Sequence, residues 1–329
     1  MLTENLPRIP IAFLPTPVVE MARLSDAVGG VRILAKRDDQ TGLATGGNKA
    51  RKLEFLVAEA LAQGADTLLT VGGPQSNHTR QTAAAATMYG LRAVLILGGC
   101  NPSLWDGNLL LDDLLGAEVR WAGERPLAEV MEEAAAEEER AGHRPYLIPL
   151  GGSNPLGAVG YVLAMEELLG QLEDLEIEVD AIFLPTGSAG TQAGALVGAK
   201  ALDFGGQIVG ISVASGARSV REKLRELAPA TARLLGLEVG FEERDFVVYD
   251  DYIGGGYGVL GPPEREAIRT VARTEGVLLD PVYTGRAMAG LLDLIGQGIV
   301  QPGQNILFWH TGGTSALFAY TQGLLGMPG

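Results

Sequence analysis

The stretch that decides the fold is "AIFLPTGSAGTQAGALVGAKAL", residues 181–202. An apolar strand ends at Pro185, a loop with two glycines follows at residues 186–191, and the alanine-rich remainder has the composition of a helix. Glycines allow several backbone N–H groups to point at one centre, and a helix N-terminus adds partial positive charge. The stretch therefore predicts either a phosphate cup at a strand–helix junction or a plain tight turn.

The composition of this cup narrows its ligand. It lacks both the Lys-Ser/Thr pair of a P-loop and the three-glycine spacing of a dinucleotide site. It also contains no lysine or arginine, which suits one small phosphomonoester held by N–H groups. The predicted cup consists of Thr186, Gly187, Ser188, Ala189, Gly190 and Thr191.

Most of the chain repeats the same order of apolar strand, turn and amphipathic helix. This order predicts an α/β fold of mainly parallel, twisted sheets flanked by helices, with ligands at the carboxyl ends of the strands. Ten strands are many for one small sheet, so we expect two sheets and two domains. The predicted strands are residues 31–36, 66–71, 93–97, 117–121, 145–150, 181–185, 208–213, 246–250, 276–280 and 305–310.

The chain is acidic, because 25 basic and 40 acidic residues among 329 give a formal charge of −15. This charge argues against nucleic acid or an anionic membrane as the main partner, and a small molecule is expected instead. The dense acidic run at residues 129–144 has the pattern of a solvated helix face. The start lacks the pattern of a signal peptide and no apolar run is long enough to span a membrane, so we expect a cytoplasmic protein.

Cysteine and histidine are scarce. The single cysteine, Cys100, allows no intramolecular disulfide, which fits a reducing compartment. Its position after "LILGG" predicts a buried thiol rather than a nucleophile. His143 and His310 have no metal-like spacing with His78, so no metal site is expected.

A second strand–helix junction lies in "DTLLTVGGPQSNHTRQTAAAATMYG", residues 66–90. The strand runs into Gly72 and Gly73, and Gln75, Ser76, Asn77 and His78 then gather at the start of a helix. Such donors at a helix N-terminus suit a carboxylate. Capping of the helix by Ser76 or Asn77 is the alternative, but capping requires only one of these side chains.

A third junction is "TGGNKARKLEF", residues 45–55. If a helix begins at Lys49, this lysine projects within about 45° of the aliphatic stripe, whereas Lys52 lies about 105° away and Arg51 nearly opposite. Burial and the positive end of the helix dipole both lower the pKa of an inward lysine, and this favours the free amine that a Schiff base requires. The alternative is a lysine that snorkels from the helix edge.

Together these junctions supply the parts of a pyridoxal-phosphate enzyme, and the chain also resembles a known family. From about residue 10 to residue 320 it is similar to the D-cysteine desulfhydrase and 1-aminocyclopropane-1-carboxylate (ACC) deaminase family, which has the tryptophan synthase β-like fold. The segments that carry the resemblance are "KRDDQTGLATGGNKARKLEFLVAEA", "QSNHTRQTAAAA", "GGSNPLGAVGY", "PTGSAGTQAG", "GGGYG", "LLDPVYTGRAMAGL" and "HTGGTSALFAY".

The resemblance implies roles toward the cofactor, pyridoxal 5'-phosphate. Lys49 matches the lysine that forms the Schiff base and moves the Cα proton, and Asn77 matches the residue bonded to the phenolic oxygen of the cofactor. Residues 187–191 match the phosphate loop, and Thr311 matches the partner of the pyridine nitrogen. A hydroxyl holds that nitrogen protonated less well than a carboxylate, so the ring is a weaker electron sink, which suits β-elimination.

The resemblance also implies a substrate site. Ser76, Asn77 and His78 match the group that holds the substrate carboxylate. Ser76 is also expected among the catalytic residues, with Tyr257 in "GGGYG" and Tyr283 in "DPVYTG".

The branch of the family depends on three positions. ACC deaminases carry glutamate, leucine and glutamine where this chain has Thr284, Thr311 and His78, and the three residues here match D-cysteine desulfhydrases. The expected reaction is β-elimination of D-cysteine, with ACC deamination and L-cysteate sulfo-lysis as alternatives. A sulfonate favours an additional cation, but Arg218 and Arg286 are both expected on the surface.

The resemblance implies an arrangement of two domains. The smaller domain, residues 50–155, is expected to be inserted in a larger cofactor-binding domain of residues 1–49 and 156–329, and members of the family are usually homodimers. A non-catalytic cofactor carrier or amino-acid sensor is the alternative from another class. The presence of Lys49, Ser76, Tyr257 and Tyr283 together argues against it, because a carrier needs no proton-transfer groups.

Overall fold

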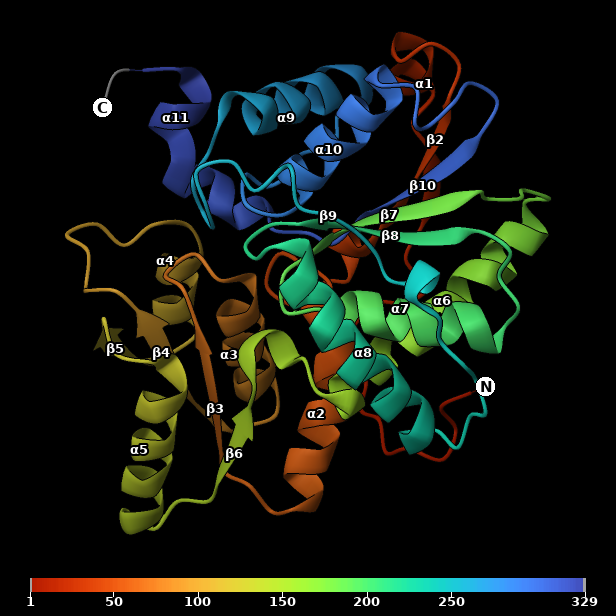
Figure 1. Cartoon of the computed structure of the whole chain (residues 1–329). Helices are drawn as coiled ribbons and strands as arrows, with labels where there is room; N and C mark the ends of the chain where they lie inside the picture. The colour runs from red at the N-terminus through yellow and green to blue at the C-terminus, as the bar shows by residue number, and fades with distance from the viewer. Residues whose placement is uncertain (1, 328–329) are drawn as a thin grey trace.

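The computed structural model describes residues 2–327, and its strands form two sheets (Figure 1). The larger sheet has the order β1-β2-β10-β7-β8-β9 and the smaller one β5-β4-β3-β6. Among the described residues, β1 and β2 are the one antiparallel pair of strands. The strands are β1 (Val18–Glu20), β2 (Arg32–Arg37), β3 (Thr67–Gly72), β4 (Arg92–Gly98), β5 (Glu118–Gly123), β6 (Pro145–Ile148), β7 (Ala181–Thr186), β8 (Gln207–Ser212), β9 (Val247–Tyr249) and β10 (Asn305–His310).

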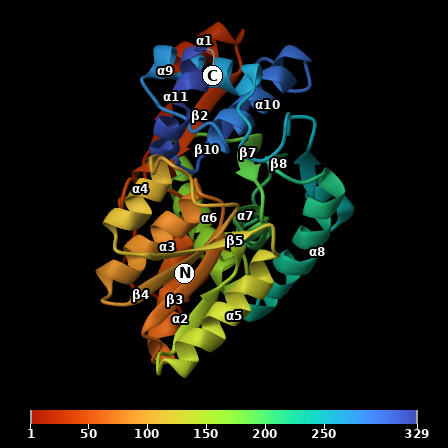
Figure 2. The same ribbon diagram turned by 90° about the vertical axis from the view of Figure 1, so that its left-hand side faces the viewer.

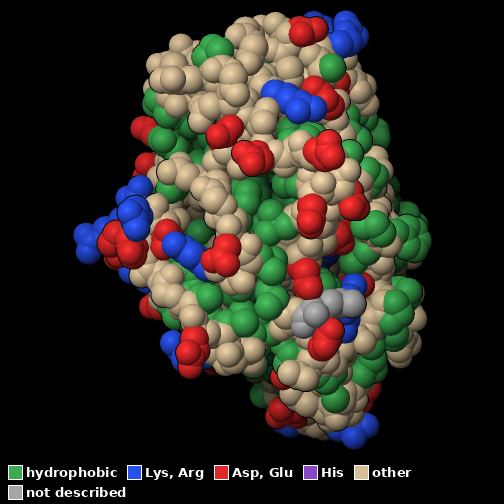
Figure 3. Space-filling view, turned by 90° about the vertical axis from the view of Figure 1, so that its right-hand side faces the viewer, with side chains coloured by type: hydrophobic (Ala, Val, Ile, Leu, Met, Phe, Trp, Pro, Cys, Tyr) green, Lys and Arg blue, Asp and Glu red, His purple; other side chains and the backbone are tan. Residues whose placement is uncertain are grey.

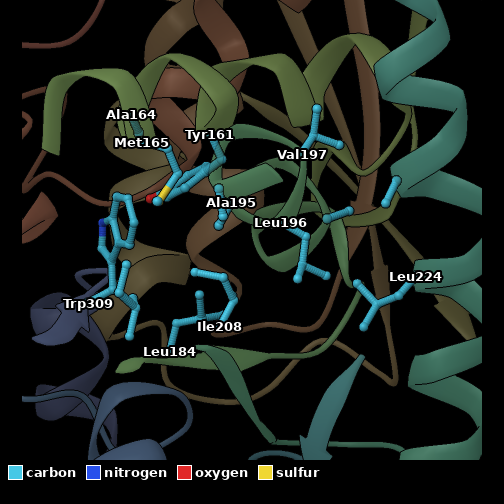
Figure 4. Packing of buried hydrophobic residues seen from close by; sticks show 14 of the residues in the cluster. Tyr161, Ala164, Met165, Leu184, Ala195, Leu196, Val197, Ile208, Leu224 and Trp309 are labelled. Carbon is cyan, nitrogen blue, oxygen red and sulfur yellow. The ribbon is translucent and has the colours of Figure 1, made fainter. Parts of the chain in front are cut away.

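Helices cover both faces of the larger sheet (Figure 1). The helices α6 (Pro155–Asp174), α7 (Gly190–Ala201) and α8 (Ala217–Leu234) cover one face, and α1 (Ala22–Ala27), α9 (Pro262–Glu275) and α10 (Thr284–Gly296) cover the other. Figure 4 shows the first layer, where Leu184 and Ile208 from the strands meet Met165, Leu196 and Leu224 from the three helices. Strands buried on both faces become uniformly apolar, which explains "AIFLP" in β7.

The smaller sheet is covered in the same way (Figure 2). On one face lie α2 (Lys49–Ala62), α3 (Asn77–Met88) and α4 (Gly107–Leu114), and on the other lies α5 (Leu127–Arg140). All four strands fall within the predicted smaller domain, whose boundaries remain a prediction. The remaining short elements are η1 (Asp38–Gln40), η2 (Leu150–Gly152), η3 (Glu243–Asp245), η4 (Thr314–Tyr320) and α11 (Thr321–Leu325).

The α/β class and the mainly parallel sheets are confirmed, but two strand predictions are wrong. Residues 276–280 form no strand, because Gly276 ends α9 in a left-handed conformation and Asp280 turns the chain into α10 by accepting the N–H groups of Val282, Tyr283 and Thr284. Strand β1 was not predicted, since its three residues show no apolar run.

Glycines bring α2, α6 and α7 unusually close together. A Cβ on Gly160 of α6 would lie 2.4 Å from the carbonyl oxygen of Arg51, and one on Gly194 of α7 would lie 2.1 Å from that of Ala158. Two helices whose backbones touch have little freedom to slide past each other. The start of α2, with Lys49, is therefore fixed relative to the start of α7, with the predicted cup.

The surface agrees with the acidic composition: Figure 3 shows acidic side chains spread over one whole face of the molecule. No helix within residues 2–327 combines the length and apolarity needed to cross a membrane. Cys100 is exposed, so its predicted burial is wrong. It lies after the end of β4, in the loop that leads to α4 rather than in the core of the sheet.

Candidate active site

A cavity of about 420 Å³ lies between the two sheets, where strands of both sheets end. The carboxyl ends of β3, β4 and β7 and the residues just after β8 and β10 all contribute to its wall. This is the position where parallel sheets bind ligands. Of the predicted site residues, all but Gly190 line the cavity: Lys49, Ser76, Asn77, His78, Thr186, Gly187, Ser188, Ala189, Thr191, Tyr257, Tyr283 and Thr311.

The predicted phosphate cup is an open helix N-terminus. Ala189 precedes α7 in the left-handed conformation, with φ of 68°, and no side chain caps the helix. The Thr186 hydroxyl is buried and has no hydrogen-bond partner within residues 2–327. An uncapped N-terminus and an unpaired hydroxyl beside a cavity form a site for an anion.

A lysine lies behind this cup although the loop itself contains none. Lys52 is fully buried, and its Nζ donates to the carbonyl oxygen of Gly151 at 3.1 Å and to Ser153 Oγ at 3.2 Å. A Cβ added to Gly190 would lie 2.7 Å from this Nζ and 2.4 Å from Ser153 Oγ, so both groups lie against the loop. The cup thus has a lysine behind it that the loop sequence does not reveal, although burial and the neighbouring Lys49 lower the pKa of the Lys52 amine well below its usual value.

The helical phasing of α2 missed Lys52 because it assumed one buried face. Helix α2 packs against α3, η2 and α6, which leaves almost no side of it in solvent. Arg51, predicted to lie opposite the core, is buried in ion pairs with Asp38 and Glu167. The spacing of Lys49 and Lys52 was a usable signal, since residues three apart share a helix side.

Lys49 is held at the cavity by its neighbour. Asn48 donates its backbone N–H to the carbonyl oxygen of Thr311 at 3.0 Å and its side-chain Nδ2 to Thr191 Oγ1 at 2.9 Å. The first turn of α2 is thus tied to both β10 and α7. Lys49 has no ion-pair partner in the described chain, and burial lowers its pKa to about 8. A larger fraction of its amine is therefore uncharged near neutral pH than in an exposed lysine.

The second junction differs from the cup because it is capped. Ser76 Oγ accepts the backbone N–H groups of His78 at 3.2 Å and Thr79 at 3.3 Å. The imidazole Nε2 of His78 bonds Thr70 Oγ1 at 2.8 Å, and burial lowers its pKa well below the usual value. His78 is thus neutral and offers a carboxylate no positive charge. The carboxylate-binding roles of Ser76, Asn77 and His78 remain predictions.

Two tyrosines lie between the junctions. Their hydroxyl oxygens are 2.8 Å apart, and their rings meet edge to face. Tyr257 lies beside Gly73 of the second junction and Tyr283 beside Gly187 of the cup. Burial raises the pKa of both phenols, so both remain protonated at neutral pH. The pair can therefore donate a proton to a group bound in the cavity.

The choice between branches of the family used Thr284, Arg286 and Arg218, and each of these side chains bonds to other groups of the protein. The Thr284 hydroxyl donates to Asp280 Oδ1 at 2.8 Å and accepts the Asp280 N–H at 2.7 Å, and Thr284 does not line the cavity. Arg286 is fully buried, against prediction: it pairs with Glu264 and donates to the carbonyl oxygens of Val213, Gly256 and Val259. Arg218 is a surface residue as predicted, with a side chain 93% exposed.

Comparison with known proteins places this geometry in a family. Residues 9–312 match the family model described as pyridoxal-phosphate dependent enzyme. The chain is 45% identical to a D-cysteine desulfhydrase of Klebsiella pneumoniae (strain 342), over 97% of this chain and 99% of the relative. A crystal structure of an ACC deaminase homologue superposes with a TM-score of 0.92 at 40% identity, covering 99% of this chain and 97% of the other.

More distant structures share the fold alone. A threonine deaminase from Solanum lycopersicum has a TM-score of 0.68 at 18% identity, covering 96% of this chain and 83% of the other. The predicted resemblance, the fold and the cofactor are confirmed by these matches. The chain belongs to the pyridoxal-phosphate dependent enzyme family, in the group that includes D-cysteine desulfhydrases and an ACC deaminase homologue.

Proposed function

We propose that this chain is a D-cysteine desulfhydrase, which converts D-cysteine and water to pyruvate, ammonia and hydrogen sulfide. The observation that carries the proposal is one cavity in which an amine of lowered pKa, Lys49, faces the same space as the hydroxyl pair of Tyr257 and Tyr283. A β-elimination requires such a pair of roles, because one group removes the Cα proton and another protonates the leaving group. The 45% identity to a D-cysteine desulfhydrase over nearly the whole chain supports this choice.

The residues at the cavity fit pyridoxal phosphate. The open N-terminus of α7, the unpaired Thr186 hydroxyl and Lys52 together suit its phosphate. Three residues that line the cavity would hold the rest of the cofactor: Lys49 its aldehyde carbon, Asn77 its phenolic oxygen and Thr311 its ring nitrogen. When bound, the cofactor supplies an electron sink that stabilises negative charge at the substrate Cα.

The chain's own groups then divide the proton transfers. The Lys49 amine takes the Cα proton, and its lowered pKa keeps a reactive fraction unprotonated. The Ser76 hydroxyl and the Asn77 amide donate to the substrate carboxylate. Tyr283, backed by Tyr257, gives a proton to the departing sulfur.

ACC deaminase is the second candidate, because an ACC deaminase homologue shares 40% identity and the same fold. Opening a cyclopropane ring requires additional acid–base help, and position 284 is the natural place for a glutamate to supply it. Here position 284 is a threonine, and its hydroxyl is already hydrogen-bonded to Asp280. For L-cysteate lysis, neither Arg286 nor Arg218 reaches the cavity, whereas Lys223 of α8 lines it and is the cation available to a sulfonate, so this reaction stays an alternative that the test below decides.

The test is parallel incubation of purified holoprotein with D-cysteine, L-cysteine, L-cysteate and ACC, measuring keto acid and sulfide. Pyruvate and sulfide formed fastest from D-cysteine would support the proposal. 2-Oxobutyrate from ACC would replace it with the deaminase, and pyruvate with sulfite from L-cysteate would replace it with the sulfo-lyase. A change in colour without product would indicate a carrier or sensor.

We also propose that the enzyme is a cytoplasmic homodimer in which residues 50–155 form a domain inserted in the rest. The apolar side chains of Leu110 and Leu114 on α4 and Phe318 on the adjoining η4 are exposed, which provides a surface for a second copy. Light scattering during size-exclusion chromatography measures the mass directly. A mass near one chain, 34.5 kDa, would contradict the dimer.

A further inference from the structure

Asn108 is a buried residue that connects several segments by hydrogen bonds, and none of the proposed catalytic steps uses it. It lies at the start of α4, is 0% exposed and makes five hydrogen bonds. Its Oδ1 accepts Arg80 Nε at 2.8 Å and Ser315 Oγ at 2.6 Å, and its Nδ2 donates to the carbonyl oxygen of Gln75 at 2.9 Å and to Asn77 Oδ1 at 2.8 Å. Its backbone N–H donates to Gln75 Oε1 at 2.8 Å.

The partners of Asn108 fix the direction of its amide. A guanidinium can only donate, so the end that faces Arg80 is the oxygen. A backbone carbonyl can only accept, so the end that faces Gln75 is the nitrogen. Both constraints agree, and Asn108 therefore presents an N–H group to Asn77.

This direction sets the orientation of Asn77 in turn. An N–H group from Asn108 must be met by the oxygen of the Asn77 amide, and this leaves Asn77 Nδ2 as the donor for the cavity that the residue lines. Nδ2 makes no hydrogen bond to any protein group in residues 2–327. A donor is what an anionic phenolic oxygen requires.

We infer that Asn108 is a positioning residue that holds the Asn77 amide with its N–H group toward the phenolic oxygen of the cofactor. The inference rests on the role proposed for Asn77. The device spans the two sheets, since Asn108 and Asn77 belong to helices on the smaller sheet and Ser315 follows β10 of the larger one. Arg80 and Gln75, which set the direction of the Asn108 amide, both lie on the side of the smaller sheet, and Ser315 adds one bond from the larger sheet.

The decisive variant is Asn108→Asp, which keeps the size of the side chain but replaces the donor with an acceptor. Asn77 then turns its N–H group toward Asp and its oxygen toward the cofactor. A phenolate that loses a donor is less stable, so the visible absorbance of the bound cofactor should titrate at higher pH. The dissociation constant of the cofactor should rise about tenfold, as expected for one charge-assisted hydrogen bond.

A double-variant cycle separates orientation from other effects. Asn77→Ala alone should shift the titration midpoint, and adding Asn108→Asp to it should shift the midpoint no further. If Asn108→Asp fails to fold, Asn108→Ala carries the test with a smaller shift in the same direction. Gln171→Glu is the control, because this amide bonds Lys36 and Thr16 on the α6 side of the larger sheet, outside the cavity wall.

The outcomes are distinct. A shift by Asn108→Asp that persists in the Asn77→Ala background would show a direct charge effect and overturn the orienting role. An unchanged midpoint in Asn108→Asp, with a shifted one in Asn77→Ala, would overturn only the role of Asn108. An unchanged midpoint in Asn77→Ala would overturn the proposed contact of Asn77 itself. The readout is absorbance, so none of these outcomes depends on which amino acid the enzyme cleaves.

Discussion

The two strand–helix junctions that face the cavity have the same order of strand, loop and helix but differ in how their helices begin. Both follow fully buried strands, β7 and β3. Helix α7 starts after Ala189 with no side-chain cap, so its first N–H groups await an external acceptor. Helix α3 starts after Ser76, whose own oxygen accepts two of them. The first junction therefore suits a phosphate, whereas the second contacts a ligand through side chains.

This difference shows that a cluster of polar residues at a helix start does not by itself define an anion site. What matters is whether the N–H groups are already satisfied. The two junctions also differ in their basic side chains: Lys52 lies against Gly190 of the open junction, and His78 belongs to the capped one. Burial lowers the pKa of both side chains well below the usual value. Lys49 is placed between the two, tied through Asn48 to Thr191.

The largest effect should come from removing the residue that the two junctions share. Lys49→Ala should lower the rate of keto-acid formation by at least about 10³-fold, because a general base and the cofactor linkage are lost together. The visible band of the bound cofactor should also move to the wavelength of the unlinked form. Lys200→Ala, which removes a lysine paired with Asp245, should leave both unchanged. A Lys49→Ala variant of normal rate would refute the assignment.

The same lysine should destabilise the empty protein. Its pKa is about 8 in the folded chain and 10.5 in the unfolded one, so between these values the unfolded state binds more protons and stability rises with pH. Lys49→Met should therefore stabilise the cofactor-free protein by about 3 kcal/mol below pH 8, with the gain vanishing near pH 10.5. Urea unfolding at pH 7 and pH 10.5 measures this difference. An equal gain at both pH values would point to packing instead.

The open junction should depend on its cation. Lys52→Met keeps the length of the side chain and removes the amine that a bound phosphate would hold protonated, so the cofactor dissociation constant should rise about 10- to 100-fold. The Michaelis constant at saturating cofactor should change little, because Lys52 lies on the phosphate side. Equilibrium dialysis of the cofactor checks the first expectation. An unchanged dissociation constant would mean that the phosphate is bound without help from Lys52.

A matched pair of glycine variants compares the junctions directly. A Cβ on Gly190 meets Ser153 Oγ at 2.4 Å and Lys52 Nζ at 2.7 Å, whereas one on Gly73 meets only Tyr257 Cε1, at an ordinary 3.6 Å. Gly190→Ala should therefore weaken cofactor binding about tenfold. Gly73→Ala should leave cofactor binding within about twofold and alter the Michaelis constant. Equal losses of cofactor affinity in the two variants would contradict the proposal that the first junction binds the cofactor phosphate and the second binds the substrate.

The smallest effect should come from the cap itself. Ser76→Ala removes the acceptor for two N–H groups of α3 and should cost about 1 kcal/mol of stability. Ala189→Ser, in contrast, should change stability little, since the α7 N-terminus has no cap to lose. Thermal unfolding of the cofactor-free variants measures both. A stable Ser76→Ala would mean that the cap contributes nothing.

The meeting of the three junctions at one cavity could be predicted from the sequence, because local order was enough. Parallel strands place their carboxyl ends at one edge, so the residues after β3, β7 and β10 could be expected to meet. The burial of Arg51, Lys52 and Arg286 could not be predicted from periodicity, because it depends on elements distant in sequence that enclose α2 and α10. Ion pairs with Asp38 and Glu264 make such burial tolerable.

The central claim is that the two lysines near the start of α2 have different tasks, with Lys49 linked to the cofactor and Lys52 at its phosphate. Borohydride reduction of the holoenzyme fixes the cofactor to the amine that carries it, and fragmentation of the modified peptide by mass spectrometry locates that amine. We predict that the cofactor is found on Lys49 with Lys52 unmodified. Modification of Lys52 would contradict the account.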